Sequence, residues 1–151
     1  MIAIRRLCAA ALSAVVSFSG PRALAGADLE VRDAWVRATV PGQPVAGAYL
    51  TLKSPVAVRL IAARSEMAQA VEIHEMSLKD GVMRMRRLES LELPAGREVK
   101  LAPGGIHLML LDLKRPLLAG EQIELDLVTA AGNPTSITTR IHVPVRTEPP
   151  R

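Results

Sequence analysis

The chain has 151 residues, 49% of them hydrophobic and 23% charged, which suits one domain with its own core and is short for two. Arg5, Arg6 and Arg22 lie in an N-terminal stretch without acids, so residues 26–151 carry 16 basic against 15 acidic side chains. This near-neutral balance argues against nucleic-acid binding, which needs a surplus of Lys and Arg.

The first 25 residues are predicted to be a secretory signal peptide. Arg5 and Arg6 precede the apolar run 7–18, and Ala23-Leu24-Ala25 provides small residues for cleavage near Ala25, or two residues later. The run is shorter than the roughly 18 residues that a membrane-spanning helix needs, so no permanent membrane anchor is expected. The predicted organisation is a signal peptide (1–25), one domain (26–146) and a short disordered tail (147–151).

The single cysteine, Cys8, lies inside the apolar run and would be removed with the signal. The exported protein would then have no disulfide, no thiolate metal ligand and no cysteine nucleophile. Cys8 also lacks a preceding run of small residues and is very close to the N-terminus, so a lipid-anchored cysteine is not expected.

Short segments rich in β-branched or alternating apolar residues follow, separated by turn formers such as Pro103-Gly104-Gly105. This pattern predicts an all-β domain, a barrel or sandwich, with little helix beyond a turn or two within 62–70. The aromatics after the signal are Trp35 and Tyr49, so the core should be aliphatic. The predicted strands are 45–52, 57–63, 69–76, 82–88, 97–101, 106–113, 122–128 and 136–143.

Asp80-Gly81 is a dipeptide typical of two-residue hairpin turns, because both positions tolerate positive φ. A hairpin centred there fixes which residues face each other across the two strands. One face would pair His74 with Arg87, Met76 with Met85 and Leu78 with Met83, and the other face would pair Glu75 with Arg86.

His107 and Met109 are two residues apart, so a strand over 106–113 would present both side chains on one face. They form one half of a predicted metal site, and the hairpin face with His74, Met76, Met83 and Met85 forms the other. Imidazole and thioether together favour copper(I), and the missing thiolate excludes a blue-copper centre. Each of these residues could instead be an ordinary packing residue. His142 and Met67 are left out, as a strand histidine and a packing methionine.

The spacing His74, ten residues, Met85, twenty-one residues, His107, one residue, Met109 resembles the periplasmic CuA chaperone family, PCu(A)C. The likeness covers roughly residues 28–143 and extends to 34–38, 48–52, 81–86 and 103–109. It implies a cupredoxin-like Greek-key β-barrel that binds one copper(I) through these four side chains, with Met76 and Met83 as possible auxiliary ligands.

The resemblance also implies a role: a monomeric periplasmic carrier, not an enzyme, that delivers copper toward the CuA centre in cytochrome c oxidase subunit II, alongside a Sco-type protein. The chain lacks the C-terminal His- and Met-rich extension of some members, so a second copper(II) site is not expected. The alternatives are a periplasmic β-sandwich for interaction or copper tolerance without delivery and, less expected, a copper oxidase or reductase.

Overall fold

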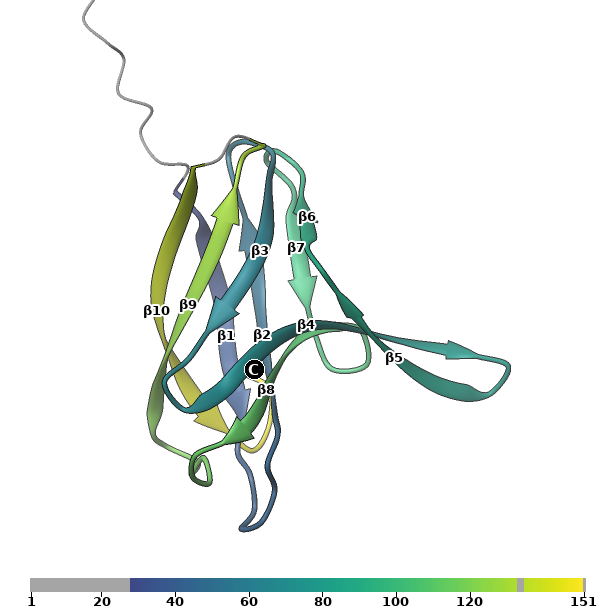
Figure 1. Cartoon of the computed structure of the whole chain (residues 1–151), viewed down its shortest axis with the longest axis vertical. Helices are drawn as coiled ribbons and strands as arrows, with labels where there is room; N and C mark the ends of the chain where they lie inside the picture. Colours follow the sequence, from purple (N-terminus) through teal and green to yellow (C-terminus); the bar gives the residue numbers. More distant parts are fainter. Residues whose placement is uncertain (1–27, 133–134, 151) are drawn as a thin grey trace, which may run out of the picture.

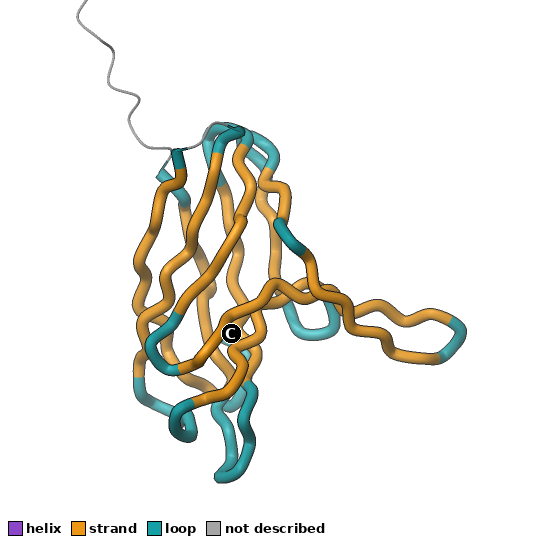
Figure 2. Tube along the Cα trace, in the orientation of Figure 1, coloured by secondary structure: helices purple, strands orange, loops and turns teal. Residues whose placement is uncertain are grey.

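The computed structural model describes residues 28–132 and 135–150, and every regular element in them is a strand (Figure 1; Figure 2). The all-β prediction is confirmed. No helix long and apolar enough to cross a membrane occurs in these residues. The predicted signal peptide and Cys8 lie outside them. The ten strands are β1 (Glu30–Arg37), β2 (Ala46–Lys53), β3 (Val58–Arg64), β4 (Ala68–Lys79), β5 (Val82–Leu88), β6 (Leu91–Leu93), β7 (Glu98–Leu101), β8 (Ile106–Leu113), β9 (Gln122–Ala130) and β10 (Ser136–Arg146).

Seven strands form a closed barrel in the order β4-β8-β2-β1-β10-β9-β3, and β3 returns to β4 through the pair Ala63 and Val71. Neighbours are antiparallel except β1 and β10, which run parallel. The remaining strands lie outside this ring: β5 pairs with β4, β6 with β3 and β7 with β2.

The core is aliphatic, as predicted. Its largest fully buried side chains are leucines and valines from the inward faces of the strands, for example Leu52, Leu60, Leu108, Leu125 and Val143. Alternation along each strand leaves the other face of the sheet for polar and chemically active residues. Met67 packs against the edge of the core, which confirms its interpretation as a packing residue.

The possible helix within 62–70 is wrong. Strand β3 runs to Arg64 and β4 begins at Ala68, with a tight turn between them in which the Ser65 hydroxyl accepts a hydrogen bond from the Met67 amide. The alanines that suggested helix are small inward-facing residues: Ala63 and Ala68 are both buried in the core.

The β4–β5 hairpin extends away from the barrel (Figure 1). Asp80 and Gly81 both have positive φ, 53° and 75°, as the predicted turn requires. The register agrees with the sequence prediction at every pair, including Glu75 with Arg86, whose side chains form an ion pair of 2.7 Å. We call residues 76–86 the arm.

Residues 147–150 follow β10 without regular structure, and Pro149 and Pro150 line a pocket with Trp35 and Tyr49. The disordered tail stays a prediction.

Candidate metal centre

The two histidines of the predicted site are brought together by the pairing of β4 with β8. His74 is the direct cross-strand partner of His107, so both side chains leave the sheet on the same face. Their ring centroids are 6.0 Å apart with an edge-on orientation. Ile73 and Leu108, the residues next to the histidines along β4 and β8, leave the sheet on the opposite face and are buried in the core. Strand periodicity therefore directs both imidazoles outward from the core.

His107 is nonetheless only 3% exposed, because neighbouring side chains cover the outer face at this point. The Tyr49 ring lies 6.2 Å from the His107 ring. The Nδ1 of His107 is 3.0 Å from the carbonyl oxygen of Gly105, which can only accept, so Nδ1–H is the donor. The lone pair of Nε2 is left for a ligand bond.

In His74 the other ring nitrogen, Nε2, makes the hydrogen bond. Its Nε2 lies 2.8 Å from Oε2 of Glu72, two residues earlier on the same face of β4, and Nε2–H donates to that carboxylate. Its Nδ1 is buried and has no hydrogen-bond partner among the described residues. A buried ring nitrogen without a partner is unfavourable unless something else occupies its lone pair.

Glu72 links this histidine to β5. Its other carboxylate oxygen lies 3.1 Å from a guanidinium nitrogen of Arg87, the cross-strand partner of His74 on β5. The hydrogen bond from His74, with the charge of Arg87 nearby, lowers the pKa of Glu72 below its ordinary value, although partial desolvation opposes this. The carboxylate is therefore ionised at neutral pH and acts only as an acceptor.

The thioethers flank the histidine pair on the same face. Met109 pairs with Glu72 on one side of it. Met76 and Met85 are cross-strand partners on the other side, where the Met76 amide donates a hydrogen bond of 3.1 Å to the Gly105 carbonyl. Met76 is half-buried and Met85 is 47% exposed. Met83 lies further out, opposite Leu78 near the tip of the arm, and is 55% exposed.

The register thus gathers the predicted donors on one face, but the ranking among the thioethers stays a prediction. No group of three or more His, Cys, Asp or Glu side chains in residues 28–132 and 135–150 could hold a metal ion. The side chains that the register does bring to this face are the two imidazoles and the nearby thioethers. Such a donor set is soft and uncharged, which favours copper(I) over zinc, calcium or magnesium.

His142, left out of the site at the sequence level, lies on β10. It is exposed and its Nε2 is 3.5 Å from Glu124 on β9. It belongs to a surface charge cluster in which Arg140 binds Asp126, at 2.7 Å, and Glu124.

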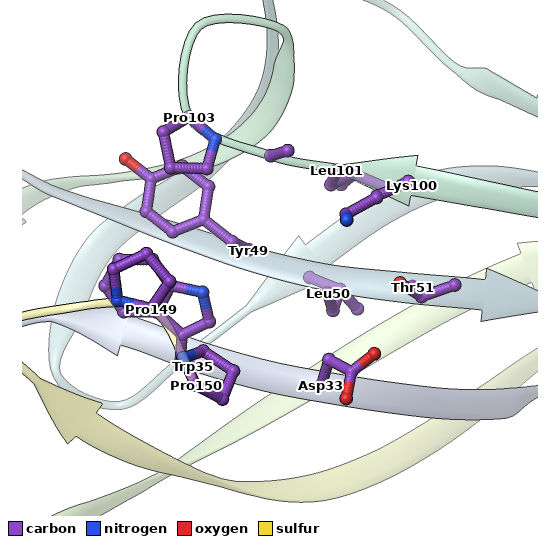
Figure 3. Close-up of a pocket in the computed structure, with 11 residues that line it drawn as sticks. Asp33, Trp35, Tyr49, Leu50, Thr51, Lys100, Leu101, Pro103, Pro149 and Pro150 are labelled. Atoms are coloured by element: carbon purple, nitrogen blue, oxygen red, sulfur yellow. The ribbon is translucent and has the colours of Figure 1, made fainter.

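A pocket of about 400 Å³ adjoins the centre (Figure 3). Trp35 and Tyr49 line it with their ring centroids 4.7 Å apart, and Pro149 and Pro150 line it beside Trp35. Tyr49 also faces His107. Sequence reasoning missed Glu72 and Tyr49 as neighbours of the site. The position of Glu72 two residues before His74 was the available signal, whereas nothing in the sequence pairs Tyr49 with His107.

Fold and site together define a class: a cupredoxin-like β-barrel with a two-histidine, methionine-flanked centre on its outer face. Residues 29–143 match the family described as "Putative lipoprotein LpqE-like", and the chain belongs to this LpqE-like family. It is 36% identical over 120 residues to "Putative lipoprotein Lxx21020" of Leifsonia xyli subsp. xyli, over 78% of this chain and 69% of that protein.

Solved structures confirm the fold. The copper-bound PCuAC domain from PmoF2 superposes with a TM-score of 0.63 at 24% identity, covering 80% of this chain and 93% of that domain. Apo-DR1885 from Deinococcus radiodurans gives 0.59 at 26% identity over 98% and 95%. Its copper(I) form gives 0.55 at 27% identity over 85% and 83%. The predicted cupredoxin-like architecture is therefore confirmed.

Proposed function

We propose that this protein is an exported copper(I) carrier that binds one ion through His74, Met85, His107 and Met109. The observation that carries the proposal is the facing pair of imidazoles, each with one nitrogen tied and the other left for a ligand, flanked by thioethers. PCuAC structures that contain copper share the fold, which supports copper as the cargo.

The proposed role is delivery in the periplasm, toward the CuA centre in cytochrome c oxidase subunit II and alongside a Sco-type protein, by a monomer without enzymatic activity. Uncharged ligands leave the charge of the ion uncompensated, which suits a site that must release it. The family and relative names carry the word lipoprotein and support export. That Cys8 is removed and not lipidated stays a prediction.

Titration of residues 26–151 with copper(I) against a competing chelator tests the site. We expect one equivalent to bind with a dissociation constant below about 1 µM. The double variant His107→Ala, Met109→Ala should bind roughly 100-fold or more weakly, at about tenfold per lost ligand bond. His142→Ala is the matched control, because this exposed histidine lies on β10 and should leave the affinity unchanged. Unchanged affinity in the double variant would exclude the assignment.

The thioethers can be ranked with leucine substitutions, which keep volume and remove sulfur. Met85→Leu should weaken copper(I) binding about tenfold, Met76→Leu less, and Met83→Leu, nearest the tip of the arm, least. If Met76→Leu has the largest effect, the half-buried Met76 replaces Met85 as the ligand.

A further inference from the structure

The two histidines of the centre have opposite free nitrogens. In His107, Nδ1–H donates to the Gly105 carbonyl at 3.0 Å, so the lone pair is on Nε2. In His74, Nε2–H donates to Glu72 at 2.8 Å, so the lone pair is on Nδ1. Neutral imidazole has one donor and one acceptor nitrogen, and the hydrogen bond made by one nitrogen determines which lone pair remains for a ligand.

Glu72 is held where it can impose this choice. It leaves β4 on the same face as His74, and the ion pair with Arg87 at 3.1 Å fixes its second oxygen. The His74 and Glu72 side chains are only 14% and 22% exposed, so solvent competes weakly for their hydrogen bond. Carboxylates that accept from the far nitrogen of a metal-binding histidine orient the ring and raise its basicity.

The orphaned Nδ1 is the second, independent observation. It is buried and has no hydrogen-bond partner among the described residues, whereas the other ring nitrogen, Nε2, is bonded to Glu72. The structure thus leaves one unsatisfied acceptor on the residue whose sheet face also carries His107, Met76 and Met109.

We propose that Glu72 is a positioning residue that fixes the tautomer of His74, so that His74 binds the metal through Nδ1 whereas His107 binds through Nε2. This assignment rests on the proposed copper(I) site but makes a claim about the metal-free protein as well. Arg87 supports Glu72 from β5 and thereby connects the geometry of the imidazole to the hairpin that carries Met85.

Long-range ¹H–¹⁵N NMR of the imidazoles in the metal-free protein tests the tautomers directly. We expect His74 to be protonated at Nε2 and His107 at Nδ1 at neutral pH. Addition of one equivalent of copper(I) should shift Nδ1 of His74 and Nε2 of His107. A His74 ring protonated at Nδ1, or copper-induced shifts at its Nε2, would overturn the proposal. Because the first measurement needs no metal, it succeeds or fails independently of the copper-carrier function.

Variants separate positioning from folding. Glu72→Leu should mix the His74 tautomers and weaken copper(I) binding about 10- to 100-fold, the range found for such outer partners. Glu72→Gln retains an acceptor oxygen and should restore the tautomer and most of the affinity. Glu75→Gln is the matched control, since Glu75 is on the opposite face of the same strand and pairs with Arg86. Wild-type tautomers and affinity in Glu72→Leu would refute the role of Glu72, and a loss of fold there leaves the Gln variant to decide.

Discussion

Tyr49 lies between the single tryptophan of the chain and the buried imidazole of His107. Its hydroxyl end extends back over Gly47, the residue that pairs with Met109. A Cβ at position 47 would lie 2.5 Å from the Tyr49 oxygen and 2.9 Å from the adjacent ring carbon. Glycine is thus required here for the close approach of the phenol ring, which lies beside His107 of the candidate metal centre.

Gly47→Ala should therefore displace Tyr49 and cost about 1–3 kcal/mol of stability, the usual range for overpacking. Denaturant unfolding followed by fluorescence measures both effects, because Trp35 contacts Tyr49 and is the only tryptophan. Gly105→Ala is the control for stability, since its added Cβ would meet only the Ala102 oxygen, at an ordinary 3.7 Å. Equal stability of the two variants would show that the ring does not depend on Gly47.

At the scale of elements, the arm is the part of the structure with the least support. Its two strands pair with each other across the turn, and large apolar side chains, including Leu78 and Met83, are exposed to solvent. A two-stranded hairpin of this kind is only marginally stable by itself. Its conformation therefore depends heavily on the Asp80-Gly81 turn.

Gly81→Ala places a side chain at φ 75°, which costs roughly 1–2 kcal/mol. We expect amide hydrogen exchange in β5 to accelerate about tenfold while the barrel strands exchange as before, and copper(I) binding to weaken because β5 carries Met85 and Arg87. Gly42→Ala introduces the same strain, at φ 82°, in the β1–β2 connection. It should leave β5 exchange unchanged, and equal acceleration of β5 in both variants would contradict a local effect.

The strands that the sequence predicted are those with clear alternation and flanking turn formers. Strand β1 was missed because its alternation is broken: the register shifts between Arg32 and Trp35, with Asp33 at φ 51°, so Trp35 and Val36 are both buried. Strand β6 is three residues long, too short for any period to show.

The parts of the candidate site that depend on local sequence patterns were likewise predictable. The i, i+2 spacing and the hairpin turn placed the donors on common faces, since both are local properties. The pairing of β4 with β8, and hence of His74 with His107, is a long-range contact that no local pattern encodes. Tyr49 joins the site only through that pairing and the register of β2 with β8, whereas Glu72 contacts His74 through the local i, i+2 spacing on β4.

For the whole molecule, two surface carboxylates paired with arginines bear on stability in acid. Hydrogen bonds from Arg140 and Arg115 lower the pKa of Asp126 and Glu121 below their ordinary values of 3.8 and 4.5. A carboxyl group with a depressed pKa binds fewer protons folded than unfolded, so its contribution is present above the ordinary value and is lost as pH falls through the folded one.

The melting temperature should therefore hold between about pH 7 and pH 5 and decline below about pH 4.5. Asp126→Asn, which cannot ionise, should make that decline shallower, by a small amount because the pair is solvent-exposed. Thermal melts at several pH values in constant salt measure this, and an acid decline as steep in the variant as in wild type would exclude the pair as a cause.

Copper binding should also be visible in global stability. A ligand present at 100 times its dissociation constant stabilises the native state by about 2.7 kcal/mol, on the order of 10 °C for a domain of this size. Thermal melts of residues 26–151 with and without copper(I) test this, with calcium as the control ion. A melting temperature indifferent to copper(I) would favour the alternative, an interaction protein whose methionines and histidines only pack.

Strand β5 lies at the free edge of the sheet, and Arg84, Arg86 and Arg87 occupy three of its seven positions. If two copies joined edge to edge in antiparallel register about Met85, Arg84 of each would face Arg86 of the other. Like charges directly opposite destabilise such pairing. The arginines of β5 thus disfavour this edge-to-edge association, which would otherwise bury the exposed Met83 and Met85 of the arm.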